Sequence, residues 1–283
     1  MTSSALPLHH AVRYVQPLRE GGSLPAVVET DTGGLQVVKF RGAGQGAKVL
    51  IAELIVGGMA DLLGLPVPAL SLIQLSERFG RSEPDPEIQE ILRRSHGTNI
   101  GMRYLDGAFN FDPLAADDII GPELAARIVW LDALVTNPDR TARNPNLMIW
   151  QRRPWLIDHG AALYAQHDWA SVDETRARTP FPLIERHVLM RGAGSILAAD
   201  ESLATMLDEP AVRALVNAVP DELFEDVTGP VGLGDFPDAA AARARYIEYL
   251  LTRLQGRSGF VETAEAARLR VSASPPERLQ ARR

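Results

Sequence analysis

The chain has 283 residues, 46% of them hydrophobic, which is enough for one large core or for two lobes. Its formal net charge of −7 argues against a general nucleic-acid binder, because such proteins usually carry a basic surface. It contains no cysteine, which excludes disulfides, zinc–thiolate sites and cysteine nucleophiles.

The N-terminal third alternates short apolar runs with turns, a pattern typical of a small antiparallel sheet. Its strands are predicted at residues 11–15, 26–29, 35–40, 67–75 and 99–105. One helix lies among them, from about Ala47 to Leu63, and Gly64 ends it. The polar, proline-containing stretch 78–87 is predicted to be an exposed loop.

Beyond Asp106 the pattern becomes mainly helical. One helix is indicated by apolar residues at helical spacing: Leu124, Ile128, Leu131 and Val135. Two short strands at 147–150 and 155–157 are predicted to form a hairpin, and the clearest later helix is predicted at 238–255. The end of the chain, residues 268–283, holds five Arg and one Glu.

We therefore predict an α+β protein of two lobes. Residues 1–105 form a small antiparallel-sheet lobe with one key helix, residues 106–270 a larger, mainly helical lobe, and residues 271–283 a flexible basic tail. The longest apolar stretch, residues 49–65, is broken by two acidic residues, so no membrane span is predicted. The first residues also lack the pattern of a signal peptide, and we expect a cytoplasmic protein.

Three polar residues in the middle of the chain point to chemistry. Asp139 and Asn144 lie on one loop, and Asp158 follows the second strand of the predicted hairpin. If the two strands pair, Asp158 returns beside Asn144 despite the gap in sequence. Oxygen ligands of this kind suit Mg²⁺, which neutralises the crowded phosphates of ATP, and a second carboxylate is needed to orient the attacking hydroxyl.

This set of groups predicts phosphoryl transfer. Asn144 and Asp158 are predicted to hold Mg²⁺, and Asp139 is predicted to face the acceptor hydroxyl. Asn146 is an alternative to Asn144 as metal ligand, or it fixes the loop. The histidines lack the close spacing of a zinc site, and we interpret His159 as structural or solvent-facing.

The lysines add a second group of candidates. Lys39 and Lys48 are the only lysines among 29 basic residues, so a site that needs a compact ammonium is the simplest reason for keeping one. Lys39 lies in a predicted strand. Glu53 lies in the following helix with nonpolar neighbours at helical spacing, where a lone carboxylate is costly to bury without a partner. We predict that Lys39 binds phosphates and that Glu53 positions it.

A glycine-containing turn is the candidate for covering the nucleotide. Gly21, Gly22 and Ser23 lie between the first two predicted strands, and backbone amides of such a turn can cradle phosphate. A second glycine-rich segment, residues 42–46, follows Lys39 and is interpreted as a flexible linker.

The stretch that contains Asp139, Asn144 and Asp158 resembles the HipA-like kinases and, more distantly, the phosphatidylinositol 3- and 4-kinases. The shared features are the Asp–Asn spacing of Asp139 and Asn144, the apolar strand after it, and the hairpin that leads to Asp158-His159-Gly160. The opening residues 137–140 are similar too, as is the helix with Glu53 that ends in Gly-Leu-x-Val-Pro, although Ala52 stands where the family has Asn. The resemblance covers roughly residues 20–165.

The resemblance implies a two-lobed protein-kinase-like fold and an ATP- and Mg²⁺-dependent kinase that acts on a hydroxyl acceptor, with protein Ser/Thr favoured. Two alternatives keep the fold: a kinase for a small molecule or lipid head group, and a non-catalytic nucleotide-binding pseudokinase. A third is a metal-dependent hydrolase built on Asp132, Asp139 and Asp158, which would act without ATP. A DNA-binding or toxin-partner role finds support only in the basic tail.

Overall fold

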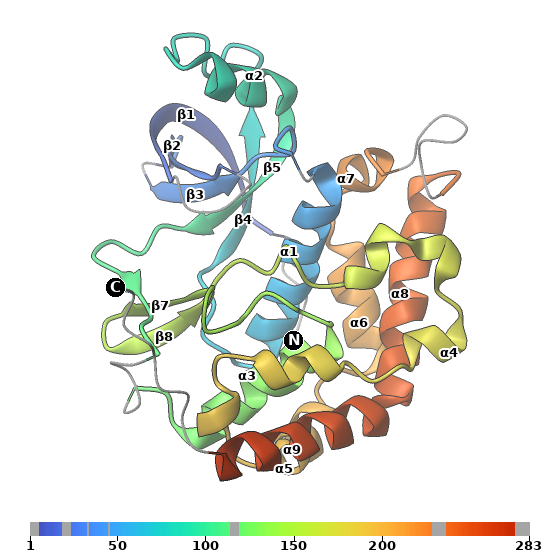
Figure 1. The fold of residues 1–283 in the computed structure, drawn as a ribbon. Coiled ribbons are helices and arrows are strands. Elements are labelled where there is room, and N and C mark those ends of the chain that lie inside the picture. Colours follow the sequence, from blue (N-terminus) through green and yellow to red (C-terminus); the bar gives the residue numbers. More distant parts are fainter. Residues whose placement is uncertain are drawn as a thin grey trace.

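The computed structural model describes residues 6–18, 24–32, 34–44, 46–113, 119–227 and 236–274. A small sheet lies at one end of the molecule and a larger helical region at the other, with helix α1 (Gly46–Leu62) running between them (Figure 1). No helix within the described ranges is long and apolar enough to cross a bilayer.

The five predicted N-terminal strands are present and close into a barrel in the order β1-β2-β3-β5-β4. Their bounds are β1 (Leu8–Pro17), β2 (Ala26–Thr30), β3 (Leu35–Lys39), β4 (Leu70–Leu75) and β5 (Gly97–Arg103). Neighbouring strands are antiparallel except for β1 and β4, which are parallel. The barrel has its own small apolar core, which includes Val28, Val38 and Ile73.

Helix α1 is buried on nearly all sides, which explains why its sequence is apolar around its whole circumference. Its residues belong to the large core of the helical region, and it packs against α6 (Glu209–Asn217) and α7 (Asp221–Glu225) as well as the sheet. Glu53, at the middle of the helix, has no exposed surface. The helix therefore links the strand that carries Lys39 to the helical region.

The helical region is organised around α3 (Pro122–Leu134), which is almost entirely buried. A three-stranded sheet in the order β6-β7-β8 lies beside it, formed by β6 (Phe109–Asn110), β7 (Leu147–Trp150) and β8 (Arg153–Leu156). The remaining α-helices are α4 (Glu174–Ala177), α5 (Ile196–Leu203), α8 (Ala239–Gln255) and α9 (Arg257–Ala273).

The structure differs from the sequence-based expectation in two helices. Residues 78–87 were expected as loop, but α2 (Pro86–Arg94) begins there, capped by the Asp85 side chain, which accepts hydrogen bonds from two backbone amides of its first turn. Helix α9 extends through residue 273, into the segment expected as a tail. Arg268 within it pairs with Glu265. Residues 275–283 lie outside the described part of the chain.

Candidate functional site

The hairpin brings Asp158 back beside the polar loop, as the sequence predicts. Strands β7 and β8 are antiparallel, with Leu147 opposite Leu156. One step further, the Ile157 amide donates to the Asn146 carbonyl at 3.1 Å. Asp158 follows directly, with a left-handed φ of 56° that turns the chain at the end of the hairpin. Its backbone therefore follows the residue that pairs with Asn146, at the end of the polar loop.

Asp139 is held by the amides of the same loop. Its Oδ2 accepts a hydrogen bond from Asn144 Nδ2 at 2.8 Å and another from Asn146 Nδ2 at 3.1 Å. Its backbone amide donates to Asn137 Oδ1 at 3.1 Å. Because both asparagines use their amide nitrogens here, each keeps its amide oxygen for another partner. Asn144 is exposed and Asn146 is buried, so the two sequence-based options for a ligand differ in access to solvent.

Lys39 joins the sheet to this loop region. Its Nζ donates to Glu53 Oε1 and, at 2.6 Å, to Asp158 Oδ1. The side chains of Lys39 and Glu53 are 6% and 0% exposed, whereas that of Asp158 is 41% exposed. The ion pair between Lys39 and Glu53 that the sequence suggested is present, and Asp158 is a second carboxylate on the same ammonium.

Burial and the neighbouring charges act in opposite directions on the pKa values of Lys39, Glu53 and Asp158. Burial alone would lower the pKa of Lys39, but the carboxylates of Glu53 and Asp158 outweigh it and raise that pKa above its ordinary value. Burial would raise the pKa of Asp158, and the Lys39 ammonium outweighs it and holds the pKa below the ordinary value. Burial is the stronger effect on Glu53 and raises its pKa. Beside this ammonium, Asp158 on the solvent side is held in its ionised form, whereas burial opposes ionisation of the deeper Glu53.

Gly160 allows α1 to approach the site closely. A Cβ built on Gly160 would overlap Val49 Cγ1 and lie 3.2 Å from Glu53 Oε1. Any larger residue would push α1, and with it Glu53, away from the end of the hairpin. The glycine of Asp158-His159-Gly160 is thus required by packing.

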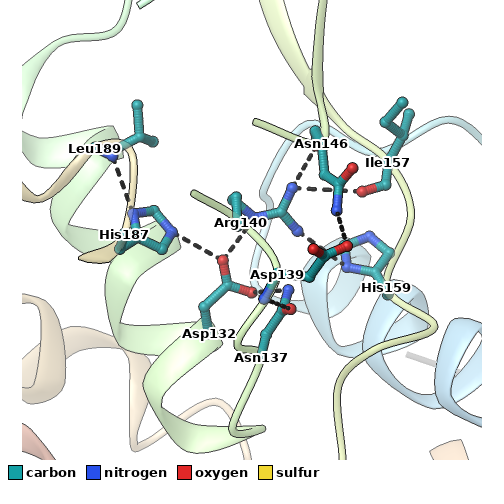
Figure 2. A network of polar contacts seen from close by, with 9 residues as sticks. All are labelled: Asp132, Asn137, Asp139, Arg140, Asn146, Ile157, His159, His187 and Leu189. Atoms are coloured by element: carbon teal, nitrogen blue, oxygen red, sulfur yellow. Dashed lines mark hydrogen bonds and ion pairs between the residues drawn. The ribbon is translucent and has the colours of Figure 1, made fainter. Parts of the chain in front are cut away.

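A buried polar network lies behind the loop, and sequence analysis missed it (Figure 2). Arg140 pairs with Asp132, which also accepts a hydrogen bond from His187 at 2.9 Å. The Asp132 side chain is therefore fully buried, whereas the hydrolase alternative needs it to reach a metal and a substrate. The available signal was the position of Asp132 on an apolar helix, since a lone buried carboxylate needs a partner. His159, expected to be structural or solvent-facing, is buried, and burial lowers its pKa to about 3.

The donor set fits a hard cation that is shared with a ligand. Among the described residues there is no group of three or more His, Asp or Glu side chains that could enclose a metal. Mg²⁺ bound together with phosphates needs only one or two protein carboxylates or amides, because phosphate oxygens and water complete its shell. Asp158 with Asn144 or Asn146 would supply oxygen ligands of this kind. The predicted nucleotide-covering turn, Gly21, Gly22 and Ser23, lies outside the described residues.

Comparison with solved structures confirms the predicted α+β, protein-kinase-like fold. The proinflammatory kinase CtkA of Helicobacter pylori is 12% identical, with 95% of this chain and 100% of that chain covered and a TM-score of 0.54. A Golgi casein kinase solved with Mn/ADP bound is 13% identical, covering 90% of this chain and 74% of its own, with a TM-score of 0.42. No curated protein matches the sequence.

The family comparison is more specific than the structural one. The model of the HipA-like kinase family matches residues 12–178, more than half of the chain, and this range contains Lys39, Glu53, the Asp139 loop and Asp158. The fold, the match and the earlier resemblance agree on a kinase-type phosphotransferase. The chain belongs to the HipA-like kinase family.

Proposed function

We propose that this protein is an ATP- and Mg²⁺-dependent kinase that transfers the γ-phosphate to a hydroxyl group. The observation that carries the proposal is the position of Lys39, whose ammonium bridges Glu53 and Asp158 at the end of the hairpin next to the Asp139 loop. One cation for phosphates, two oxygen donors for a metal and one carboxylate for the acceptor are the groups that phosphoryl transfer uses.

Each residue has a separate role in this proposal. Lys39 binds the phosphates, and Glu53 holds Lys39 from the buried side. Asp158 and Asn144, or Asn146 in its place, hold Mg²⁺, which when bound neutralises charge on the phosphates. Asp139 orients the acceptor hydroxyl and accepts its proton; its hydrogen bonds to the two asparagines keep the carboxylate aligned with the loop.

A protein Ser/Thr acceptor is favoured by membership of the HipA-like kinase family. Small-molecule and lipid-head-group acceptors remain the alternatives, and a pseudokinase would bind nucleotide without transferring phosphate. The hydrolase alternative is disfavoured because the Asp132 side chain is fully buried, in an ion pair with Arg140 and a hydrogen bond from His187.

Replacement of Asp139 separates binding from chemistry. Asp139→Ala is expected to leave the affinity for Mg²⁺–ATP within a few-fold of wild type and to lower turnover by about 10²-fold or more, because the general base is lost. Phosphate transfer is measured with radiolabelled ATP, either to added protein or to the kinase itself, and ATP affinity by calorimetry. Unchanged turnover in Asp139→Ala would contradict the assignment, and nucleotide binding without turnover in wild type would favour the pseudokinase.

A further inference from the structure

Arg140 is a buried cation at the centre of the polar network, with 1% of its surface exposed (Figure 2). A guanidinium is buried at this depth only when its donors are used. Its Nε donates to Asp132 Oδ2 at 2.6 Å. Its Nη1 donates to the carbonyl of Asn146 and, at 3.4 Å, to that of Ile157, and its Nη2 lies 3.4 Å from His159 Nδ1.

These partners include both segments that carry the proposed acceptor-facing and metal-binding residues. Asn146 belongs to the loop that holds Asp139, and its amide is itself bonded to the Asp139 carboxylate. Ile157 and His159 flank Asp158 in the sequence. One side chain therefore bonds to the loop with the acceptor-facing carboxylate and to both neighbours of the metal-binding carboxylate.

The network gives Arg140 a fixed anchor. Asp132, on helix α3, also accepts hydrogen bonds from Asn137 Nδ2 at 3.0 Å and from His187 Nε2 at 2.9 Å. The Leu189 amide donates to His187 Nδ1 at 3.0 Å, so the ring proton lies on Nε2 and points at Asp132. The Asp132 carboxylate is held by several buried hydrogen-bond donors. It therefore keeps the Arg140 guanidinium in one orientation.

We propose that Arg140 is a positioning residue for the metal site: it sets the separation between the Asp139 loop and the strand end that carries Asp158. This inference rests on the proposed function. The planar guanidinium spans two carbonyls, a carboxylate and an imidazole at once, whereas a lysine ammonium at this position reaches fewer of them in a fixed geometry. Residues in this position behind metal ligands typically contribute 10–100-fold to metal affinity.

Arg140→Lys tests the proposal because it keeps the buried positive charge and removes the planar guanidinium with its several donors. Arg253→Lys is the matched control: Arg253 is also buried, at 2% exposed, and donates to backbone carbonyls, including Ala133 at 2.9 Å and Ala177 at 2.8 Å, none of which belongs to the loop or the hairpin. Both variants lose contacts of one buried guanidinium, so general destabilisation is common to the two.

Two readouts distinguish positioning from stability. The first is hydrogen exchange at the Ile157 amide in the ligand-free protein. This amide donates to the Asn146 carbonyl and so joins the two segments that Arg140 also joins. The second is the gain in ADP affinity on adding Mg²⁺, measured by calorimetry. For Arg140→Lys we expect exchange about tenfold faster than in the control and loss of about tenfold of the Mg²⁺-dependent gain, with metal-free ADP affinity unchanged.

The two possible failures are separable. Equal Ile157 exchange and equal Mg²⁺-dependent gain in the two variants would overturn the role of Arg140. If wild-type protein shows no Mg²⁺-dependent gain at all, the proposed function fails, and ligand-free exchange at Ile157 alone decides whether Arg140 sets the spacing. If Arg140→Lys does not fold, Arg140→Gln combined with Asp132→Asn removes both buried charges, and the same two readouts apply to it.

Discussion

Lys39 and Glu53 form a buried ion pair in which each charge is stabilised by the other. Glu53 has no exposed surface, and one of its oxygens, Oε2, has no hydrogen-bond partner among the described residues. Such a carboxylate is stable in the fold mainly because Lys39 is beside it. The same lysine faces Asp158 on the solvent side, from where, in the proposed function, its ammonium binds the phosphates.

Removal of Lys39 is therefore expected to cost stability as well as activity. Lys39→Met leaves Glu53 buried and unpaired and should lower the free energy of unfolding by about 3–5 kcal/mol. Adding Glu53→Gln removes the buried charge and should recover most of that loss, while transfer activity stays absent in both variants. Urea unfolding measures the difference. A double variant no more stable than Lys39→Met would show that Glu53 does not depend on the lysine.

Much of the site was predictable because its residues are ordered along a short stretch. Spacing and a predicted hairpin indicate Asp139, Asn144 and Asp158 as candidates, and nonpolar neighbours indicate Glu53. Arg140 was not recognised because its partners are mainly backbone carbonyls and one aspartate on the preceding helix, which leave no pattern in sequence.

At the scale of elements, the strands follow from short apolar runs between turns, α3 from apolar residues at helical spacing, and α1 from a long apolar run that ends at Gly64. Helix α2 was missed although Ile88, Ile91 and Leu92 recur on it at helical spacing, because the polar, proline-containing stretch before it is typical of a loop. The packing of these residues on the barrel core is supplemented by the Asp85 cap and by Glu90, which pairs with Arg93 and Arg94 on the exposed face. The close packing of α1 on Gly160 was also beyond sequence analysis, since it joins residues distant along the chain.

Gly160→Ala is expected to move α1 away from the hairpin. The added methyl group overlaps Val49, so the free energy of unfolding should fall by about 1–3 kcal/mol. Affinity for ATP should fall with it, because Glu53 moves with the helix and no longer holds Lys39 in place. Gly192→Ala is the control, as a Cβ there meets no atom within 4 Å. Thermal unfolding and calorimetry test both effects, and equal behaviour of the two variants would contradict this packing argument.

At the scale of the whole molecule, the sheet lobe is tied to the helical region near α7. Arg41, directly after β3, donates to Glu222 on α7 and to Asp226 just beyond it, the latter at 2.5 Å. Glu222 also accepts a hydrogen bond from the Thr98 amide on β5, at 3.3 Å. Because α1 packs in the larger core, these ion pairs and α1 together fix how the sheet sits over the Asp139 loop.

Loss of the Arg41 ion pairs should lower the free energy of unfolding modestly, and less so at high salt. Arg41→Gln is expected to lower the free energy of unfolding by about 1 kcal/mol at low salt, because the pairs are only partly exposed, and by less at 1 M salt, where screening weakens them. Arg13→Gln, which breaks an exposed pair within the sheet, serves as control. Urea unfolding at two salt concentrations measures this; an Arg41→Gln effect no larger than that of Arg13→Gln would show that the tie contributes nothing.

The most direct test of the account is the magnesium dependence of nucleotide binding, measured by calorimetry with a non-hydrolysable ATP analogue. In wild type, Mg²⁺ is expected to tighten binding by about tenfold or more, and Asp158→Ala should abolish that gain. Asp168→Ala, which removes an aspartate whose side chain is 61% exposed on the following segment, should leave it intact. An unchanged Mg²⁺-dependent affinity in Asp158→Ala would contradict the metal-binding role of Asp158 and, with it, the proposed site.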